Sequence, residues 1–140
     1  MSKSINSGLR FIDFTVNDIQ YQINHDFKEQ NVNVKFNVFR DVEYVDDENN
    51  TMLVSLTVSV FEDAKENNYP FSLKINLTGV FELDDIHESE RESFAEVNAV
   101  AILFPYIRSL ISTITANANV PPLILPPINV VSLIEKEKNK

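Results

Sequence analysis

Three segments of this chain alternate between apolar and polar residues, and this period of two constrains the fold more than any other feature. Apolar side chains occupy every second position in residues 32–38, 52–60 and 71–77, with mostly polar residues between them. In a β-strand such side chains all point to one face, so each segment predicts a half-buried strand. The polar connections between these segments are short, which favours antiparallel neighbours because a parallel crossover needs about a dozen residues.

An earlier segment carries the same alternation with a change of phase. Its apolar residues stand at even positions from 12 to 16 and at odd positions from 19 to 23. One extra residue in a strand turns all later side chains to the other face, so we expect a β-bulge near Asn17 and Asp18. Gly79, inside the last strand segment, predicts either a second irregularity or a close approach by another backbone.

Beyond residue 88 the period changes to that of a helix. Ser89-Glu90-Arg91-Glu92 matches a capping box, in which the Ser hydroxyl and the last Glu carboxylate each satisfy a free amide of the first turn. Pro105 falls inside the helical pattern and should kink the helix, because proline removes one backbone donor. Apolar residues recur at three- and four-residue spacing, at Phe94, Val97, Ala101, Phe104, Ile107, Ile111 and Ile114.

Pro121 and Pro122 should end this helix near residues 117–119, and a second, short helix is expected from about Asn129 to Glu137. These patterns predict an α+β fold in one domain spanning residues 1–140. The expected architecture is a four-stranded antiparallel sheet covered on one face by a long helix, then a proline-rich connecting loop and a short C-terminal helix.

The composition counts against catalysis and nucleic-acid binding. With no cysteine, two glycines and two histidines, the chain has no thiolate site, no glycine-rich phosphate loop and no histidine cluster for a metal. We interpret His25 and His87 as solvated residues. The acidic pairs at 46–47 and 84–85 lie in polar runs, where no carboxyl group is desolvated enough to act as a general acid, so we interpret them as solvated turns. A net charge of −9 opposes binding to a phosphate backbone. We therefore expect a binding protein, with no enzymatic activity, cofactor or metal.

Two features bear on location. The first eight residues lack the apolar core of a signal peptide. The longest apolar stretch, 97–107, is interrupted by Asn98 and Pro105 and is shorter than the roughly 20 residues that a membrane span needs. We expect a cytoplasmic protein that does not insert into a membrane.

Residues 120–128 stand out because they are apolar yet lie outside the regular elements. The segment contains four prolines and five large aliphatic residues. One interpretation is a loop folded back over the core. The other is the apolar rim of a groove that receives polypeptide, since prolines keep such a loop extended and lower the entropy cost of presenting its side chains. These patterns alone leave both interpretations open.

The most distinctive run of the chain is Leu-Phe-Pro-Tyr-Ile-Arg-Ser-Leu-Ile at 103–111, followed by Val-Pro-Pro-Leu-Ile-Leu-Pro-Pro-Ile-Asn-Val at 120–130. Together these runs resemble the SecB family of export chaperones, whose signature is Leu-Phe-Pro-Tyr-x-Arg and then Pro-x-Leu-x-Leu-x-Pro-(Val/Ile)-Asn. The resemblance is close over 103–133. It is looser upstream, through Asp18-Ile19 and the runs at 34–38 and 79–81.

This resemblance implies a chaperone that needs no ATP. Family members are holdases that keep unfolded or precursor polypeptides from folding, and they assemble as homotetramers, each a dimer of dimers. They bind clients in long hydrophobic grooves between the sheet and the loop that joins the helices. The client-binding positions that match here are Val34, Phe36, Val38, Pro121 and Leu123.

The family delivers clients to the motor ATPase SecA through acidic residues on the exposed sheet face and a C-terminal tail. Asp18 matches one of these acidic positions and is the candidate SecA contact, but Gln22 and Lys74 stand where the family has glutamates. The longer tail is also missing from the sequence, so these departures count against hand-off to SecA. Two alternatives to export follow. One is a SecB-like chaperone of an antitoxin in a toxin–antitoxin–chaperone system, and the other is a module that binds a single partner.

Overall fold

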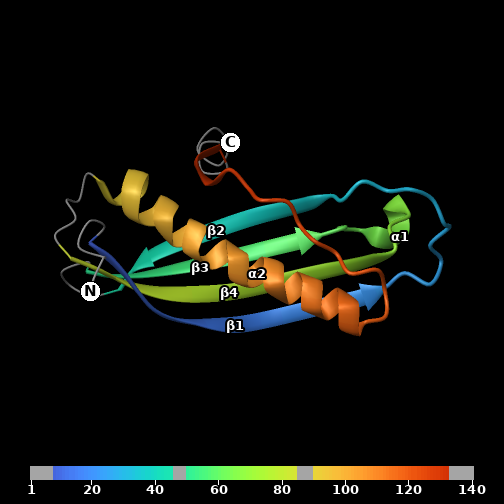
Figure 1. The fold of residues 1–140 in the computed structure, drawn as a ribbon, viewed down its shortest axis with the longest axis horizontal. Coiled ribbons are helices and arrows are strands. Elements are labelled where there is room, and N and C mark those ends of the chain that lie inside the picture. The colour runs from blue at the N-terminus through green and yellow to red at the C-terminus, as the bar shows by residue number, and fades with distance from the viewer. Residues whose placement is uncertain (1–7, 46–49, 85–89, 133–140) are drawn as a thin grey trace.

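Four long strands form one antiparallel sheet with a single long helix across one face (Figure 1). The computed structural model describes residues 8–45, 50–84 and 90–132. The strands are β1 (Leu9–Ile23), β2 (Phe36–Tyr44), β3 (Thr51–Val60) and β4 (Phe71–Leu83). The predicted α+β class and the four antiparallel strands are confirmed. The bounds of the segment at 32–38 were wrong, because residues 32–35 lie outside the sheet and β2 begins only at Phe36.

The strands are ordered β1-β4-β3-β2, so the first two strands of the chain form the two edges of the sheet. The short connections join neighbours, as predicted, because β2 pairs with β3 and β3 pairs with β4. Residues 24–35 instead cross from one edge to the other around the end of the sheet, beside the short helix α1 (Ala64–Asn67) (Figure 1). The end of the sheet beside α1 is therefore built from two connections.

Strand β1 contains the predicted bulge and a second one. Asn17 is the extra residue between the cross-strand pairs formed by Val16 and Asp18, so the expected change of phase is confirmed. Its side chain donates hydrogen bonds to Asn76 Oδ1 and Thr78 Oγ1, each 2.8 Å long. A second register shift makes Ile12 another extra residue. Ile12 is 50% exposed, so its assignment to the apolar face was wrong, and Phe11 packs against the core in its place.

The helical layer begins with the π-helical turn η3 (Arg91–Glu96) and continues as α2 (Val97–Asn117). The helix passes through Pro105 without a break, and Ala118 marks its end at the predicted place. The segment Phe94–Asn117 is longer than the apolar stretch at 97–107, and by length and composition alone it could cross a membrane, with a mean hydropathy of 1.5. A helix that packs in a protein core passes the same test. One side of α2 packs on the sheet, and the largest fully buried side chains come from both layers: Phe81, Met52, Leu56, Leu73, Ile75, Leu77, Leu103, Ile107 and Ile111.

One position of the predicted helix face was wrong. Ala101 is exposed, whereas Val100 and Leu103 are buried. A spacing of three or four residues from Phe104 allows either position 100 or position 101 on the buried side, so the sequence pattern could not choose between them. The contact of Leu103 with the sheet fixes the rotation of the helix and leaves Ala101 on the outside.

The two predicted helix starts differ in outcome. The capping box begins at Ser89, which lies outside the described residues. The short C-terminal helix begins at Val130, where Asn129 Oδ1 accepts a hydrogen bond of 3.0 Å from the Ser132 N–H. This is the arrangement of an N-cap, so the predicted start is confirmed. The predicted remainder of that helix, to Glu137, lies outside the described residues.

Gly79 allows the helix to pack closely on the sheet. A Cβ atom at this position would lie 2.6 Å from Leu103 Cδ2 and 2.9 Å from Phe81 Cε1. Both neighbours are fully buried, so neither has free space to move into. The sequence predicted a close approach at Gly79 by another backbone, and the group that approaches is a side chain of α2.

We expect Gly79→Ala to lower the free energy of unfolding by about 1–3 kcal/mol, the usual cost of overpacking a core. Urea denaturation of the purified protein measures this change. Because the crowding comes mainly from the two Leu103 methyl groups, Leu103→Ala should remove most of the added cost in the double variant. An equal cost of Gly79→Ala in both backgrounds would show that this contact does not determine the need for glycine.

Candidate functional site

Residues 120–129, the proline strap, return from the end of α2 across the sheet toward β2 (Figure 1). Within the strap the side chains alternate. Leu125 is fully buried, Leu123 is half-buried against the core, and Ile124 between them is 75% exposed. The strap therefore combines the two interpretations of this segment, because one side of it completes the core and the other presents an apolar side chain to solvent.

Side chains of α2 hold the strap by its backbone. Thr115 Oγ1 accepts a hydrogen bond of 2.9 Å from the Leu123 N–H, and Ser112 Oγ donates to the Leu123 carbonyl at 2.9 Å. Arg108 Nε donates to the Leu125 carbonyl at 3.1 Å. The backbone on each side of Ile124 is thus satisfied by α2, and Ile124 is held outward with little conformational freedom left to lose on binding.

The five predicted client-binding residues lie on three segments: Val34 on the 24–35 crossover, Phe36 and Val38 on β2, and Pro121 and Leu123 on the proline strap. Val34 and Pro121 are exposed, Phe36 is half-buried, and Val38 is 8% exposed. Phe36 and Leu123 both pack against the same hydrophobic core. Of the five, Val34 and Pro121 have the most accessible surface, and the grouping of all five into one groove stays a prediction.

Sequence reasoning missed Ile124 as a candidate contact. Among the large hydrophobic residues that the structure describes it is the most exposed, ahead of Val131 at 53% and Ile12 at 50%. The alternation of Leu123, Ile124 and Leu125 could have shown it, since an extended backbone points successive side chains to opposite sides.

The candidate SecA contact lies on the sheet face away from α2. Asp18 pairs across the strands with Asn76, and its carboxylate accepts a hydrogen bond of 2.6 Å from Gln20 Nε2. Gln22 and Lys74 are exposed on the same two strands. All three positions that the family pattern singled out therefore share one region, and Gln22 and Lys74 there carry no carboxylate of their own.

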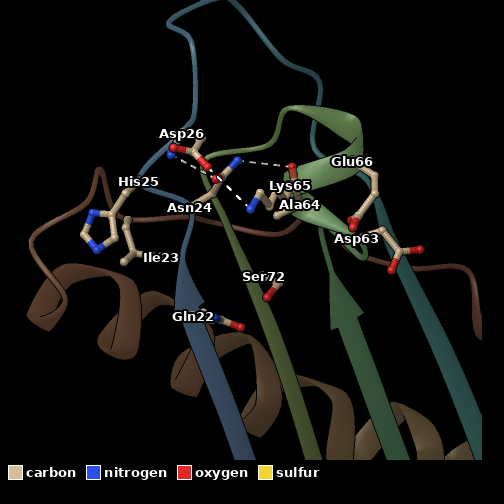
Figure 2. A pocket seen from close by; sticks show the side chains of 10 residues that line it. All are labelled: Gln22, Ile23, Asn24, His25, Asp26, Asp63, Ala64, Lys65, Glu66 and Ser72. Carbon is tan, nitrogen blue, oxygen red and sulfur yellow. Dashed lines mark hydrogen bonds and ion pairs between the residues drawn. The ribbon is translucent and has the colours of Figure 1, made fainter.

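A cavity of about 460 Å³ opens where β1 ends (Figure 2). Asn24 Nδ2 crosses it to the backbone carbonyl of Ala64 at 3.2 Å, and Lys65 forms an ion pair with Asp26 at 3.7 Å. His25 lies on the opposite side of this cavity from Glu66 (Figure 2). No group of three metal-ligating side chains occurs among the residues that the structure describes. The interpretation of His25 as a solvated loop residue agrees with its exposure, and His87 lies outside the described residues.

Comparison with known proteins identifies the family of the chain. A sequence profile described as preprotein translocase subunit SecB matches residues 13–140. The chain belongs to the SecB family. Family members are chaperones, so the prediction that this protein is not an enzyme is confirmed.

Similar proteins come from several organisms. An uncharacterized protein of Methanocaldococcus jannaschii is 37% identical over 128 residues, covering 91% of this chain and 83% of the relative. The protein-export protein SecB of Bartonella bacilliformis is 28% identical over 109 residues, covering 78% of this chain and 67% of that protein. The chain spans 61% of the SecB protein of Dinoroseobacter shibae, with 26% identity.

The SecB-like fold is also found in a solved structure. The SecB-like chaperone of Mycobacterium tuberculosis, solved in complex with a ChAD peptide from an antitoxin, matches with a TM-score of 0.66 at 16% identity. The match covers 86% of this chain and 88% of that one. The predicted SecB-like arrangement of sheet, long helix and short helix is confirmed.

Proposed function

We propose that this protein is an ATP-independent holdase of the cytoplasm that binds unfolded or precursor polypeptides for export. The observation that carries the proposal is the proline strap, which holds Ile124 in solvent between two anchored residues. Such a surface lowers the entropy cost of binding an apolar chain. Preferential binding of the unfolded state then shifts the folding equilibrium of the client without any chemical step.

Two surfaces of the chain support assembly into a homotetramer. Strand β1 is 15 residues long and lies at an edge of the sheet, where it has no second neighbour among the described strands. The outer side of α2 is uncharged, because its one charged residue, Arg108, bonds to the strap. Besides Tyr106 and Asn117, the exposed residues of α2 follow one another at three- and four-residue spacing and form one stripe: Ala101, Pro105, Ser109, Thr113 and Ala116. Pairing of β1 edges would make dimers, and α2 stripes would join two dimers.

The holdase is tested by aggregation of an unfolded client, such as chemically denatured malate dehydrogenase diluted into buffer. We expect suppression at near-stoichiometric ratios by the parent. For the same suppression of aggregation, the double variant Val34→Asp and Ile124→Asp should be needed at about tenfold higher concentration. A charge at an apolar contact weakens the free energy of client binding by about 1.4 kcal/mol or more. Both positions are exposed, so folding should be unaffected.

Thr15→Asp is the matched control, because Thr15 is exposed on β1 and lies opposite Thr78, on the face away from α2. It should behave like the parent. If the parent protein leaves aggregation unchanged, the proposed holdase function is wrong. If the parent and the double variant suppress aggregation equally well, Val34 and the strap do not contact the client.

A second function is favoured by the face that carries Asp18. Gln22 and Lys74 stand on that face where the family pattern has glutamates, which counts against hand-off to SecA. A SecB-like chaperone of an antitoxin, or a module with a single partner, needs no such surface. Pull-down from the source cell extract separates these functions. Many unrelated unfolded clients would support the general holdase, whereas one stoichiometric partner would support the alternatives.

A further inference from the structure

A cavity of about 600 Å³ opens on the sheet face away from α2, across β1, β4 and β3. It adjoins the cavity where β1 ends, because Gln22, Ser72 and Asp63 line both (Figure 2). Its volume is within the range of about 300–1,000 Å³ that is typical of small-molecule sites. We call it the Lys74 cavity, and its polar lining includes Gln22, Ser59, Ser72, Lys74, Glu62 and Asp63.

The cavity contains a buried hydroxyl group without a partner. Ser59 is only 5% exposed, yet its hydroxyl makes no hydrogen bond with another residue in the described part of the chain. Such a hydroxyl costs free energy, which a bound group recovers by bonding to it. Ser59 is paired across the strands with Lys74, and side chains paired in this way stand about 4.5–5.5 Å apart at Cβ. The unsatisfied hydroxyl therefore lies beside an ammonium group.

Lys74 is surrounded by further hydrogen-bond donors. It is exposed and makes no ion pair with a residue that the structure describes. Ser72 lies two residues before it on the same face of β4, and Gln22 is the cross-strand partner of Ser72 (Figure 2). One ammonium, two hydroxyls and an amide together form a donor set that suits a carboxylate.

Two carboxylates of the turn after β3 supply the opposite charge. Asn37 Nδ2 donates to Glu62 Oε1 at 2.9 Å, which leaves Glu62 Oε2 to accept a bond from a ligand. Asp63 stands at the N-cap position of α1, but its side chain makes no capping hydrogen bond. Within the described residues neither carboxylate forms an ion pair. Both are therefore available to ammonium groups.

We propose that the Lys74 cavity binds a free amino acid with a basic side chain, such as lysine. The cavity offers one ammonium and two carboxylates, and lysine carries one carboxylate and two ammonium groups, so the charges are complementary in sign and number. The α-carboxylate binds at Lys74 and Ser59, and the ammonium groups bind at Glu62 and Asp63. This inference does not rest on the proposed holdase function.

The test compares three ligands of similar chain length by isothermal titration calorimetry of the full chain. L-Lysine carries all three charged groups, norleucine lacks the side-chain ammonium, and cadaverine lacks the carboxylate. We expect the parent to bind lysine at least about tenfold more tightly than either analogue, because each missing group removes a charge-assisted hydrogen bond.

Variants locate the ligand. In Lys74→Gln the affinity for lysine should fall about tenfold, to the level of cadaverine, while cadaverine itself should bind no more weakly because it has no carboxylate. Ser59→Ala should weaken lysine binding about threefold to tenfold through loss of the hydroxyl. Lys28→Gln is the matched control, since Lys28 is exposed on the 24–35 crossover and does not line the cavity. It should keep the parent affinity.

Three results would overturn the proposal. The first is a parent that does not bind lysine, or that binds all three ligands equally. The second is an unchanged lysine affinity in Lys74→Gln, because the ligand would then not be bound at Lys74. The third is an equal loss in Lys28→Gln, because the net charge of the chain and not the cavity would then attract the ligand. Both lysines are exposed, so these two variants should fold like the parent, which circular dichroism checks.

Discussion

Replacement of Glu96 by alanine is expected to lower the free energy of unfolding by about 3–5 kcal/mol. Glu96 Oε1 lies 2.8 Å from Arg40 Nη1, and the side chains of the pair are only 11% and 13% exposed. Tyr44 also donates to Glu96 Oε2 at 3.0 Å. Removal of the carboxylate leaves the Arg40 guanidinium where water solvates it poorly. The free energy of unfolding therefore falls by more than it does when an exposed ion pair is removed. Chemical denaturation monitored by circular dichroism measures it.

Two control variants make this prediction specific. Glu90→Ala removes an exposed carboxylate from the same end of the helical layer and should change stability by less than about 0.5 kcal/mol. The double variant Arg40→Met and Glu96→Leu should recover most of the loss, because an apolar pair of similar size needs no desolvation of charge. If Glu96→Ala lowers the free energy of unfolding no more than Glu90→Ala does, the Arg40–Glu96 ion pair does not stabilise the packing of the helical layer on β2.

Ser109→Arg is expected to split the proposed tetramer into dimers. Ser109 lies in the middle of the uncharged stripe of α2, and every protomer would bring one new charge into the same contact. A desolvated charge without a partner costs about 2–5 kcal/mol at an interface, so association should weaken by at least about thirtyfold. Light scattering over a range of protein concentrations measures the change in mass.

Gln30→Arg is the control, since it adds the same charge at an exposed position of the 24–35 crossover, away from α2. It should leave the mass unchanged. A tetramer that survives Ser109→Arg would show that α2 does not join the dimers. A parent protein that is monomeric at all concentrations would contradict the proposed assembly as a whole.

The sequence patterns predicted the strands well because each strand is buried on one face only. Alternation of apolar and polar residues then reports directly which face meets the core, and the change of phase near Asn17 was visible for the same reason. The bulge at Ile12 was missed, because Ile12 is itself apolar and appeared to continue the even-numbered series. A bulge that exposes an apolar residue leaves no mark in the pattern.

The candidate site was predictable to a lesser extent. The signature at 103–111 and 120–130 indicated the family, and with it the importance of the proline strap. It did not show that Leu123 and Leu125 are tied to α2 while Ile124 points outward.

By itself, the sequence determined the class of the fold, the order of its main elements and the family, since these depend on local periodicity and a contiguous signature. Only the tertiary structure decided the pairing of β1 with β4, the rotation of α2 against Gly79, the burial of the Arg40–Glu96 ion pair and the outward position of Ile124. The physical reason is that each of these depends on contacts between residues far apart in the chain. Several packings satisfy the local pattern equally well, and side-chain volume and charge select one of them.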